Sequence, residues 1–190
     1  METQAAPAPA SLNWWERLIR VASPDPEIER QGRIFNGLMV VSTGLVLYLA
    51  ASFLVGYLLG YLDATTAAIA AAFPLAFVPI SLGCIALVKR GHLRQVVPVY
   101  VWATFVGIAT ATYVFDGPVS SAWVLFIWMV TVGGILIAPR YALLMTGLVV
   151  GYYGLLLGAS QLGLYAPPIL STTQSRTFFT FAFILGVLIT

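Results

Sequence analysis

Charged residues are scarce in this sequence: nine Lys or Arg, seven Asp or Glu and one His occur among 190 residues, so that only 8% are charged. An ordinary soluble domain carries roughly 25% charged residues. The sequence has a single cysteine, Cys84. A disulfide or a cysteine metal cluster within the chain is therefore excluded. The formal net charge of +2 is too small to suggest a nucleic-acid-binding protein.

Hydrophobic residues instead make up 60% of the chain, and the mean hydropathy is +0.94. A soluble domain of this size leaves roughly 30% of its surface in water, so its interior is too small for so many apolar side chains. We therefore expect hydrocarbon to surround most of the chain. This composition excludes soluble enzymes, disordered chains and secreted disulfide scaffolds.

The apolar runs predict an all-α, polytopic membrane helix bundle over residues 34–190. A span needs about 20 mostly apolar residues, and we expect five complete spans, at 34–62, 64–88, 96–115, 122–138 and 141–164. A sixth run begins at Thr177 and is still apolar at Thr190. Its 14 or so residues rise only about 21 Å, less than a hydrocarbon core of roughly 30 Å. We expect a truncated sixth span in a longer chain, with a re-entrant segment as the alternative.

The positions of Lys and Arg predict the orientation. With the N-terminus inside, only Arg176 lies outside, and the inner side collects Arg17, Arg20, Arg30, Arg33, Lys89, Arg90, Arg94 and Arg140. This asymmetry follows the positive-inside rule and predicts a multi-pass protein of the inner (plasma) membrane, with both termini cytoplasmic. Asp63 and Asp116 fall outside, at span ends where we expect their carboxylates to reach water.

The region before the first span predicts a peripheral segment. Residues 1–12 are small, Ala-rich and interrupted by Pro, which predicts a disordered tail. Residues 13–33 predict an amphipathic interfacial helix and its lead-in. We expect its anchors to be Trp14, Trp15, Arg17 and Arg20, with indoles at the level of the headgroups. A short helix packed on another protein domain is the alternative.

The predicted spans contain few candidates for catalytic or binding residues. No ionisable residue lies in the middle of a span, which argues against pumps and proton-coupled transporters, and we identify no catalytic residue and no metal site. His92 lies in a basic loop rather than inside the bundle. The candidates for an apolar ligand, such as a quinone or a carotenoid, are the four mid-membrane aromatic residues Tyr48, Trp128, Tyr152 and Tyr153. Aromatic packing is the alternative, and no cofactor is predicted outright.

Small residues at helical spacing predict close helix packing. Span five carries four glycines on one face, namely Gly147, Gly151, Gly154 and Gly158, and span one carries the pair Gly56 and Gly60. Such small-xxx-small patterns let helices approach closely. They indicate either a dimerisation face or packing inside one bundle. In addition, Pro74, Pro79 and Pro98 predict kinks, because proline leaves carbonyls without their helical donor.

The layout of residues 24–190 resembles a known family. Its features are DPEIERQGRIFNGL before span one, a basic KRG turn after span two, APRYALL between spans four and five, and Pro167 and Pro168 in the last outer turn. This order is similar to the N-terminal membrane domains of bacterial sensor histidine kinases and related cyclases of the Chloroflexi type. The resemblance implies a sensory or anchoring module of a signal-transduction protein, followed by a cytoplasmic kinase or cyclase domain.

A second interpretation stays open. The same apolar surfaces suit an accessory structural subunit of a photosynthetic or respiratory membrane complex, packed against partner helices, pigments or quinones. In either case we expect the bilayer, and a homodimer or a larger membrane complex, as partners, and no nucleic acid.

Overall fold

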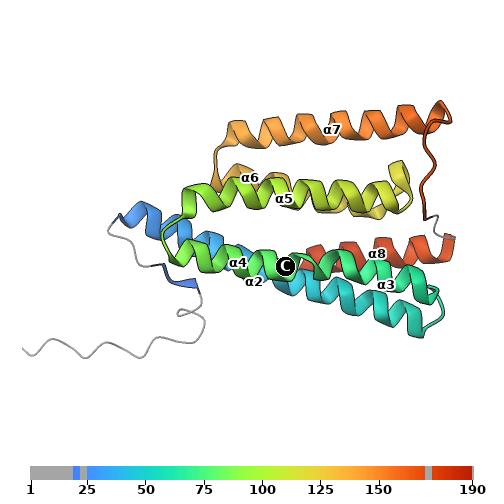
Figure 1. Cartoon of the computed structure of the whole chain (residues 1–190), viewed down its shortest axis with the longest axis horizontal. Helices are drawn as coiled ribbons and strands as arrows, with labels where there is room; N and C mark the ends of the chain where they lie inside the picture. Colours follow the sequence, from blue (N-terminus) through green and yellow to red (C-terminus); the bar gives the residue numbers. More distant parts are fainter. Residues whose placement is uncertain (1–18, 22–24, 170–172, 190) are drawn as a thin grey trace, which may run out of the picture.

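The structure is a computed structural model that describes residues 19–21, 25–169 and 173–189. Seven α-helices and two 3₁₀ turns are formed in these ranges: α2 (Pro26–Leu58), α3 (Ala64–Leu75), α4 (Phe77–Lys89), α5 (Leu93–Val114), η1 (Gly117–Val119), η2 (Ser121–Trp123), α6 (Val124–Leu136), α7 (Pro139–Gln161) and α8 (Thr173–Ile189) (Figure 1). The described residues contain a single β-bridge and no strand. The predicted all-α helix bundle is confirmed.

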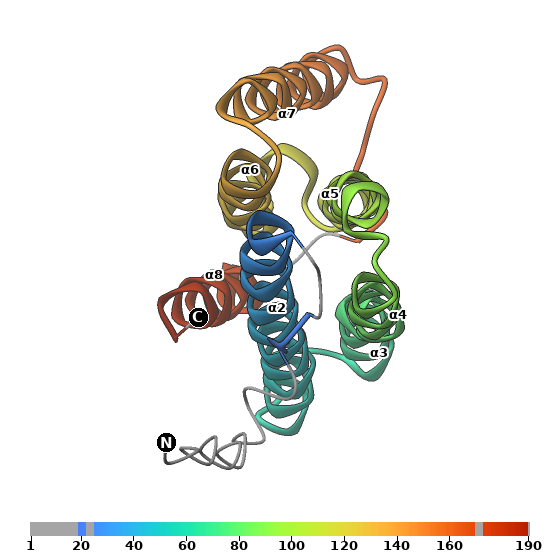
Figure 2. The same ribbon diagram turned by 90° about the vertical axis from the view of Figure 1, so that its left-hand side faces the viewer.

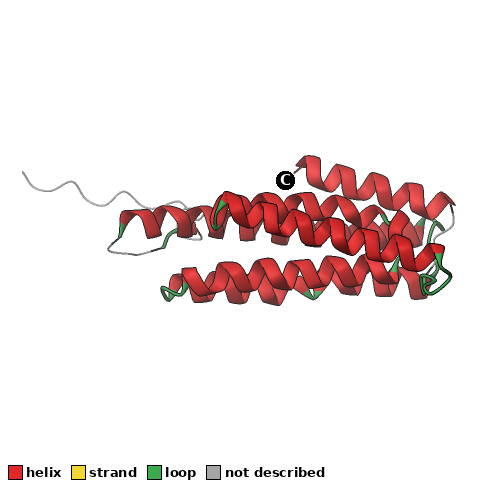
Figure 3. Ribbon diagram, turned by 90° about the horizontal axis from the view of Figure 1, so that it is seen from above, coloured by secondary structure: helices red, strands yellow, loops and turns green. Residues whose placement is uncertain are grey.

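The helices share one long axis, which is evident in the view from above (Figure 3). Seen end-on, α2 lies in the middle, with α3 and α4 on one side and α8 on the other (Figure 2). Helix α6 lies above α2 and beside α5, and α7 is the outermost helix, packed mainly on α6. A central helix surrounded by the others is the arrangement of a bundle rather than of a solenoid.

The two ends of the bundle differ in their charges. One end, which we call the basic end, is formed by the N-termini of α2, α5 and α7 and the C-termini of α4 and α6 (Figure 1). The helix termini there carry Arg30, Arg33, Lys89, Arg90, Arg94 and Arg140, against three acidic residues at the start of α2. The opposite, acidic end holds the α2–α3 turn with Asp63 and the α5–η1 junction with Asp116.

Local signals in the sequence explain where α2 and α3 begin. Asp25 caps α2 by accepting a hydrogen bond from the Glu27 N–H at 2.9 Å, and Pro26 occupies the first helical position, where its missing N–H is not needed. Asp63 caps α3 in the same way, accepting from the Thr66 N–H at 2.9 Å. The hydroxyl of Thr66 and, to a lesser extent, this backbone bond lower the pKa of the Asp63 carboxyl.

The second predicted span is broken near its middle. Helix α3 ends at Leu75 and α4 begins at Phe77, and the break falls between Pro74 and Pro79. Because these prolines have no N–H, the carbonyls of Ala70 and Leu75 lack their helical donors. The kink predicted here is confirmed, whereas Pro98 lies within α5, which continues without interruption.

Four helical segments are long and apolar enough to cross a membrane: Pro26–Leu58, Ala64–Lys89, Leu93–Val114 and Pro139–Gln161. The predicted span at 122–138 is a shorter apolar helix, Ser121–Leu136, and the last run corresponds to Thr177–Gly186. The prediction of five complete spans is therefore not confirmed. The shortening has a local cause, because 3₁₀ turns occupy 117–123 and Pro139 begins the next helix. The helices mark a membrane protein.

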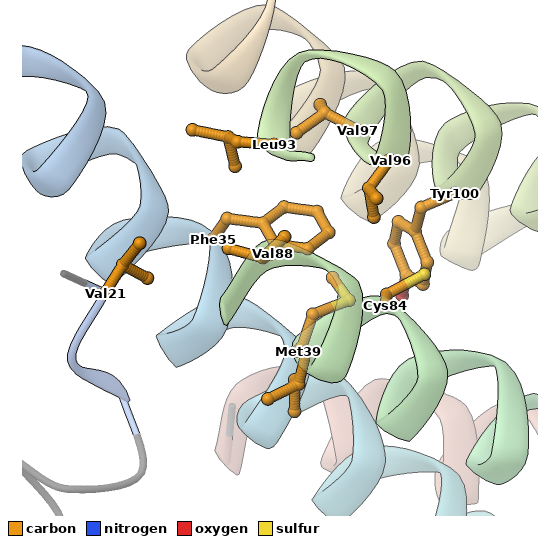
Figure 4. Packing of buried hydrophobic residues seen from close by; sticks show 10 residues of the cluster. Val21, Phe35, Met39, Cys84, Val88, Leu93, Val96, Val97 and Tyr100 are labelled. Carbon is orange, nitrogen blue, oxygen red and sulfur yellow. The ribbon is translucent and has the colours of Figure 1, made fainter. Parts of the chain in front are cut away.

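Three clusters of buried side chains hold the helices together. The cluster at the basic end joins α2, α4 and α5 (Figure 4), and in it the rings of Phe35 and Tyr100 meet edge to face at 5.9 Å. A second cluster joins α2 and α3 to α8 around Phe53 and Phe179. The third joins α5, α6 and α7 around Met129 and other apolar residues.

The short described segment before α2 folds back onto the bundle. Val21 is 2% exposed and contacts α2 at Gly32, and the Asn36 side-chain amide donates to the Ile19 carbonyl at 3.3 Å. Arg20, between them, is exposed. The predicted anchors Trp14, Trp15 and Arg17 and the predicted tail over 1–12 lie outside the described residues.

Candidate functional site: an interhelical cavity

A cavity of about 90 Å³ lies inside the bundle, toward the acidic end. Five segments line it, namely α2, the α3–α4 break, α5, the η2–α6 segment and α8, through apolar residues that include Leu49, Phe73, Pro74, Ile108, Ala111, Phe115 and Leu125. The lining is almost wholly apolar, with Asp116, Ser120 and Ser121 as its polar members.

The break in the second span shapes one wall. Pro74 and Phe77 line the cavity from either side of the break, and Gly107 lines it from α5. The ring of Phe77 lies against Gly107, where any Cβ would overlap it. A larger residue at position 107 of α5 would overlap this ring. The wall therefore depends on the glycine at 107 and on the helix break beside Phe77.

Helix α8 forms the opposite wall. Phe179 and Phe183 line the cavity and both meet Phe53 of α2, with ring centroids 5.3 and 6.2 Å apart. The Ser121 and Thr180 hydroxyls lie 2.6 Å apart, within hydrogen-bond distance. Phe179 and Phe183 therefore make α8 one of the segments in contact with whatever occupies the cavity.

Asp116 lies at the acidic end of the cavity and is only 3% exposed. The expectation that its carboxylate reaches water is wrong, because residues far along the chain cover it. Its backbone N–H donates to the Ile169 carbonyl at 3.1 Å, and the Ile169 N–H donates to the Val114 carbonyl at 3.0 Å. Its φ of 57° is left-handed, a conformation that Asp and Asn tolerate better than other side chains. Asp63, in contrast, is exposed as expected.

The four predicted ligand candidates do not line this cavity. Tyr152 and Tyr153 lie together, with ring centroids 5.7 and 5.0 Å from that of Trp123, and the Tyr152 hydroxyl donates to the Ala109 carbonyl at 2.6 Å. Tyr48 is half-buried beside α8 and Trp128 is half-buried on α6. The contacts of Tyr152 are those of aromatic packing with a satisfied hydroxyl.

The volume limits the occupant. An engineered apolar cavity of roughly 150 Å³ binds benzene or xenon, and the space here is about 90 Å³. A carotenoid or a substituted quinone is larger than this space and does not fit wholly inside it. The signal in the sequence that points to this cavity is the pair of prolines at 74 and 79, which predicts an irregular helix but not its neighbours.

The two predicted glycine motifs have different surroundings. On α7, a Cβ added at any of the four stripe positions would meet no other residue within 4 Å: Gly147, Gly151, Gly154 and Gly158. Gly56 on α2, in contrast, is covered by Phe178 of α8, and Gly60 forms the turn after α2 with a φ of 77°. The α7 stripe is therefore unused by the described part of the bundle.

The described residues contain no group of three or more His, Cys, Asp or Glu side chains placed to hold a metal ion. Comparisons with protein-family models, curated proteins and solved structures find no match to this chain. The cavity and the helix surfaces around it are therefore the observations on which a function can be argued.

Proposed function

We propose that this chain is the membrane-embedded sensory or anchoring module of a bacterial signal-transduction protein. The single observation that carries the proposal is that α8 forms part of the wall of an interhelical cavity through Phe179 and Phe183. A helix that forms one wall of a cavity changes position when the cavity is filled, emptied or compressed. Such a helix can report the state of the bundle or of the surrounding bilayer.

The distribution of charge supports the orientation that this role needs. The basic end carries Arg30, Arg33, Lys89, Arg90, Arg94 and Arg140, and cytoplasmic loops are enriched in such residues. Helix α8 runs from the acidic end toward the basic end (Figure 1). In the proposed orientation, in the inner (plasma) membrane, a segment following α8 would arrive at the cytoplasmic face, as does the segment preceding α2.

The mechanism we propose is a shift between two positions of α8. A ligand or a bilayer state changes such an equilibrium only if it interacts differently with the two positions. Here the differential contacts are those of Phe179 and Phe183 with the cavity and of Thr180 with Ser121. Occupation of the cavity by an apolar molecule larger than its present volume of about 90 Å³ favours the outward position of α8.

We propose further that the module forms a homodimer through α7. A Cβ added at any of the four glycines of the α7 stripe would meet no other described residue within 4 Å, and a smooth glycine face lets two copies of the same helix approach closely. A dimer of a signalling module would place two α8 helices in one assembly. This part of the proposal is independent of the cavity.

A second candidate function is an accessory structural subunit of a larger photosynthetic or respiratory membrane complex. It is favoured by the outward face of α7, where Leu143 is 76% and Leu155 is 74% exposed. A helix of a different protein could occupy the same face. Purification from native membranes in mild detergent separates the two: a self-contained dimer supports the sensory module, and co-migration with pigments or redox subunits supports the subunit.

The experiment that tests the sensory role measures the distance between α2 and α8. Spin labels are placed at two exposed positions, Leu47→Cys and Phe181→Cys, in a Cys84→Ala background. Ala111→Phe fills the cavity, and Val106→Phe adds the same ring on the exposed side of α5. The proposal predicts a longer distance in the first variant only. Equal distance distributions in both variants would refute coupling between the cavity and α8.

A further inference from the structure

A second space, separate from the cavity under α8, opens at the basic end of the bundle. It is a cleft of about 210 Å³ between α2, α5 and the C-terminal end of α6. The polar residues that line it are Gln31 and Arg94, and its apolar lining includes Val97, Pro98, Leu136 and Ile137. The cleft is therefore amphipathic, with charge on one part of its surface and hydrocarbon on another.

Arg94 gives the polar part its positive charge. Its side chain is exposed, and it is in neither of the two ion pairs found at this end, which join Arg30 to Glu27 and Arg33 to Glu29, both at 2.8 Å. A guanidinium presents five donors in a planar fork that matches the geometry of phosphate. Arg94 is therefore available to an anion entering the cleft.

The neighbouring carboxylate does not cancel this charge. Gln31 donates its side-chain amide to Glu27 at 2.9 Å, and Arg30 donates to both oxygens of the same carboxylate at 2.8 and 3.1 Å. The charge of Glu27 is thus neutralised by Arg30. Arg94 is the charged residue among those that line the cleft.

The start of α5 adds to the positive potential. Helix α5 begins at Leu93, and the preceding His92 makes no side-chain capping bond. The first N–H groups of a helix have no acceptor within it, and the macrodipole there favours negative charge. The His92 carbonyl accepts from the Gln95 and Val96 N–H groups, which leaves the N–H groups of Leu93 and Arg94 as the first of the helix. These two residues both line the cleft, so the helix N-terminus and the guanidinium lie at the same space.

We propose that this cleft binds the phosphate group of an anionic phospholipid from the cytoplasmic leaflet. The phosphate lies between Arg94 and the first turn of α5, and an acyl chain lies along Val97, Pro98, Leu136 and Ile137. Basic pockets between helices on the cytoplasmic side are suited to such headgroups. The inference uses the orientation of the proposed function but is independent of the sensory role of α8.

The test is native mass spectrometry of the full chain, delipidated in detergent and titrated with dioleoylphosphatidylglycerol, dioleoylphosphatidylcholine or inorganic phosphate. Arg94→Gln removes the charge of the cleft, and Arg140→Gln removes an exposed charge at the same end that does not line it. Leu136→Trp fills the apolar part of the cleft without changing any charge. Melting temperatures without lipid establish that each variant is folded.

We expect phosphatidylglycerol to bind the native chain at least tenfold more tightly than phosphatidylcholine. Arg94→Gln and Leu136→Trp should each weaken this binding fivefold or more, and Arg140→Gln should weaken it less than either. Equal losses for Arg94→Gln and Arg140→Gln would show a diffuse surface charge and overturn the site. Displacement of the lipid by millimolar inorganic phosphate alone would identify a phosphate site instead of a lipid site. If Leu136→Trp does not fold, the comparison of the two arginine variants decides.

Discussion

The ring of Phe77, at the start of α4, lies against the backbone of Gly107 on α5, where a Cβ at position 107 would overlap it. This contact joins the break in the second span to the neighbouring helix. It also places Phe77 in the wall of the cavity that α8 helps to form. The geometry of the candidate site thus depends on the absence of one side chain.

Gly107→Ala is expected to destabilise the bundle by about 1–3 kcal/mol, because overpacking forces the ring or the backbone to move. Denaturation in detergent micelles measures the change. Gly83→Ala is the control, since a Cβ there has no neighbour within 4 Å. Phe77→Leu should restore part of the stability lost in Gly107→Ala. Equal stability of the two alanine variants would contradict the contact.

Ser121→Ala is expected to loosen α8, because it removes the hydroxyl that lies 2.6 Å from that of Thr180. Side-chain hydrogen bonds between membrane helices contribute about 0.6 kcal/mol on average, so amides of α8 should exchange with deuterium about threefold faster. Thr131→Ala is the control, since its hydroxyl donates to the carbonyl of Ile127 in its own helix. Unchanged exchange in α8 would refute a role of this bond in holding the helix.

Gly151→Leu is expected to weaken self-association in liposomes at least tenfold while leaving the stability of the single chain unchanged. The physical reason is that the α7 stripe has space around it within the chain, so a larger side chain interferes only with a second copy. Energy transfer between labelled copies measures the association. Gly83→Leu, on an exposed position of α4, should associate normally. Loss of association in both variants would contradict the proposal that α7 forms the dimer interface.

Stability should fall at acid pH through Asp63. The hydroxyl of Thr66 lowers the pKa of the Asp63 carboxyl, and so does the Thr66 N–H, which donates to the carboxylate. A carboxyl with a lowered pKa stabilises the folded state above its unfolded pKa of about 3.9, and this contribution is lost as the pH falls through the folded value. The melting temperature of Asp63→Ala should therefore lie below that of the native chain at pH 7. The same difference in melting temperature at a pH low enough to protonate Asp63 in both the folded and the unfolded native chain would contradict this assignment.

Features fixed by neighbouring residues could be predicted from the sequence. Asp25 and Pro26 are local signals of this kind: the Asp25 side chain accepts from the Glu27 N–H and Pro26 occupies the first position of α2. Pro74 and Pro79 predict the break in the second span, because each lacks the N–H of a regular helix. These signals act within one turn of helix, so they need no knowledge of the partner elements.

Features that depend on distant residues were missed. Asp116 was expected in water, yet its backbone pairs with Ile169, more than fifty residues further along the chain. The cavity forms where five segments of the chain come together, and no motif in the sequence predicts which segments are neighbours. The glycine patterns illustrate the same limit: Gly56 is covered by Phe178 and Gly151 is covered by no described residue, although both belong to the same kind of motif.

The orientation of the chain in the membrane tests the account most directly. Single cysteines are introduced at Thr65→Cys, near the acidic end, and at Arg90→Cys, near the basic end, both exposed positions, in a Cys84→Ala background. A membrane-impermeant maleimide is applied to spheroplasts before and after permeabilisation. The account predicts that position 65 reacts in intact spheroplasts and that position 90 reacts only after permeabilisation. Reaction of both positions from the same side would contradict it.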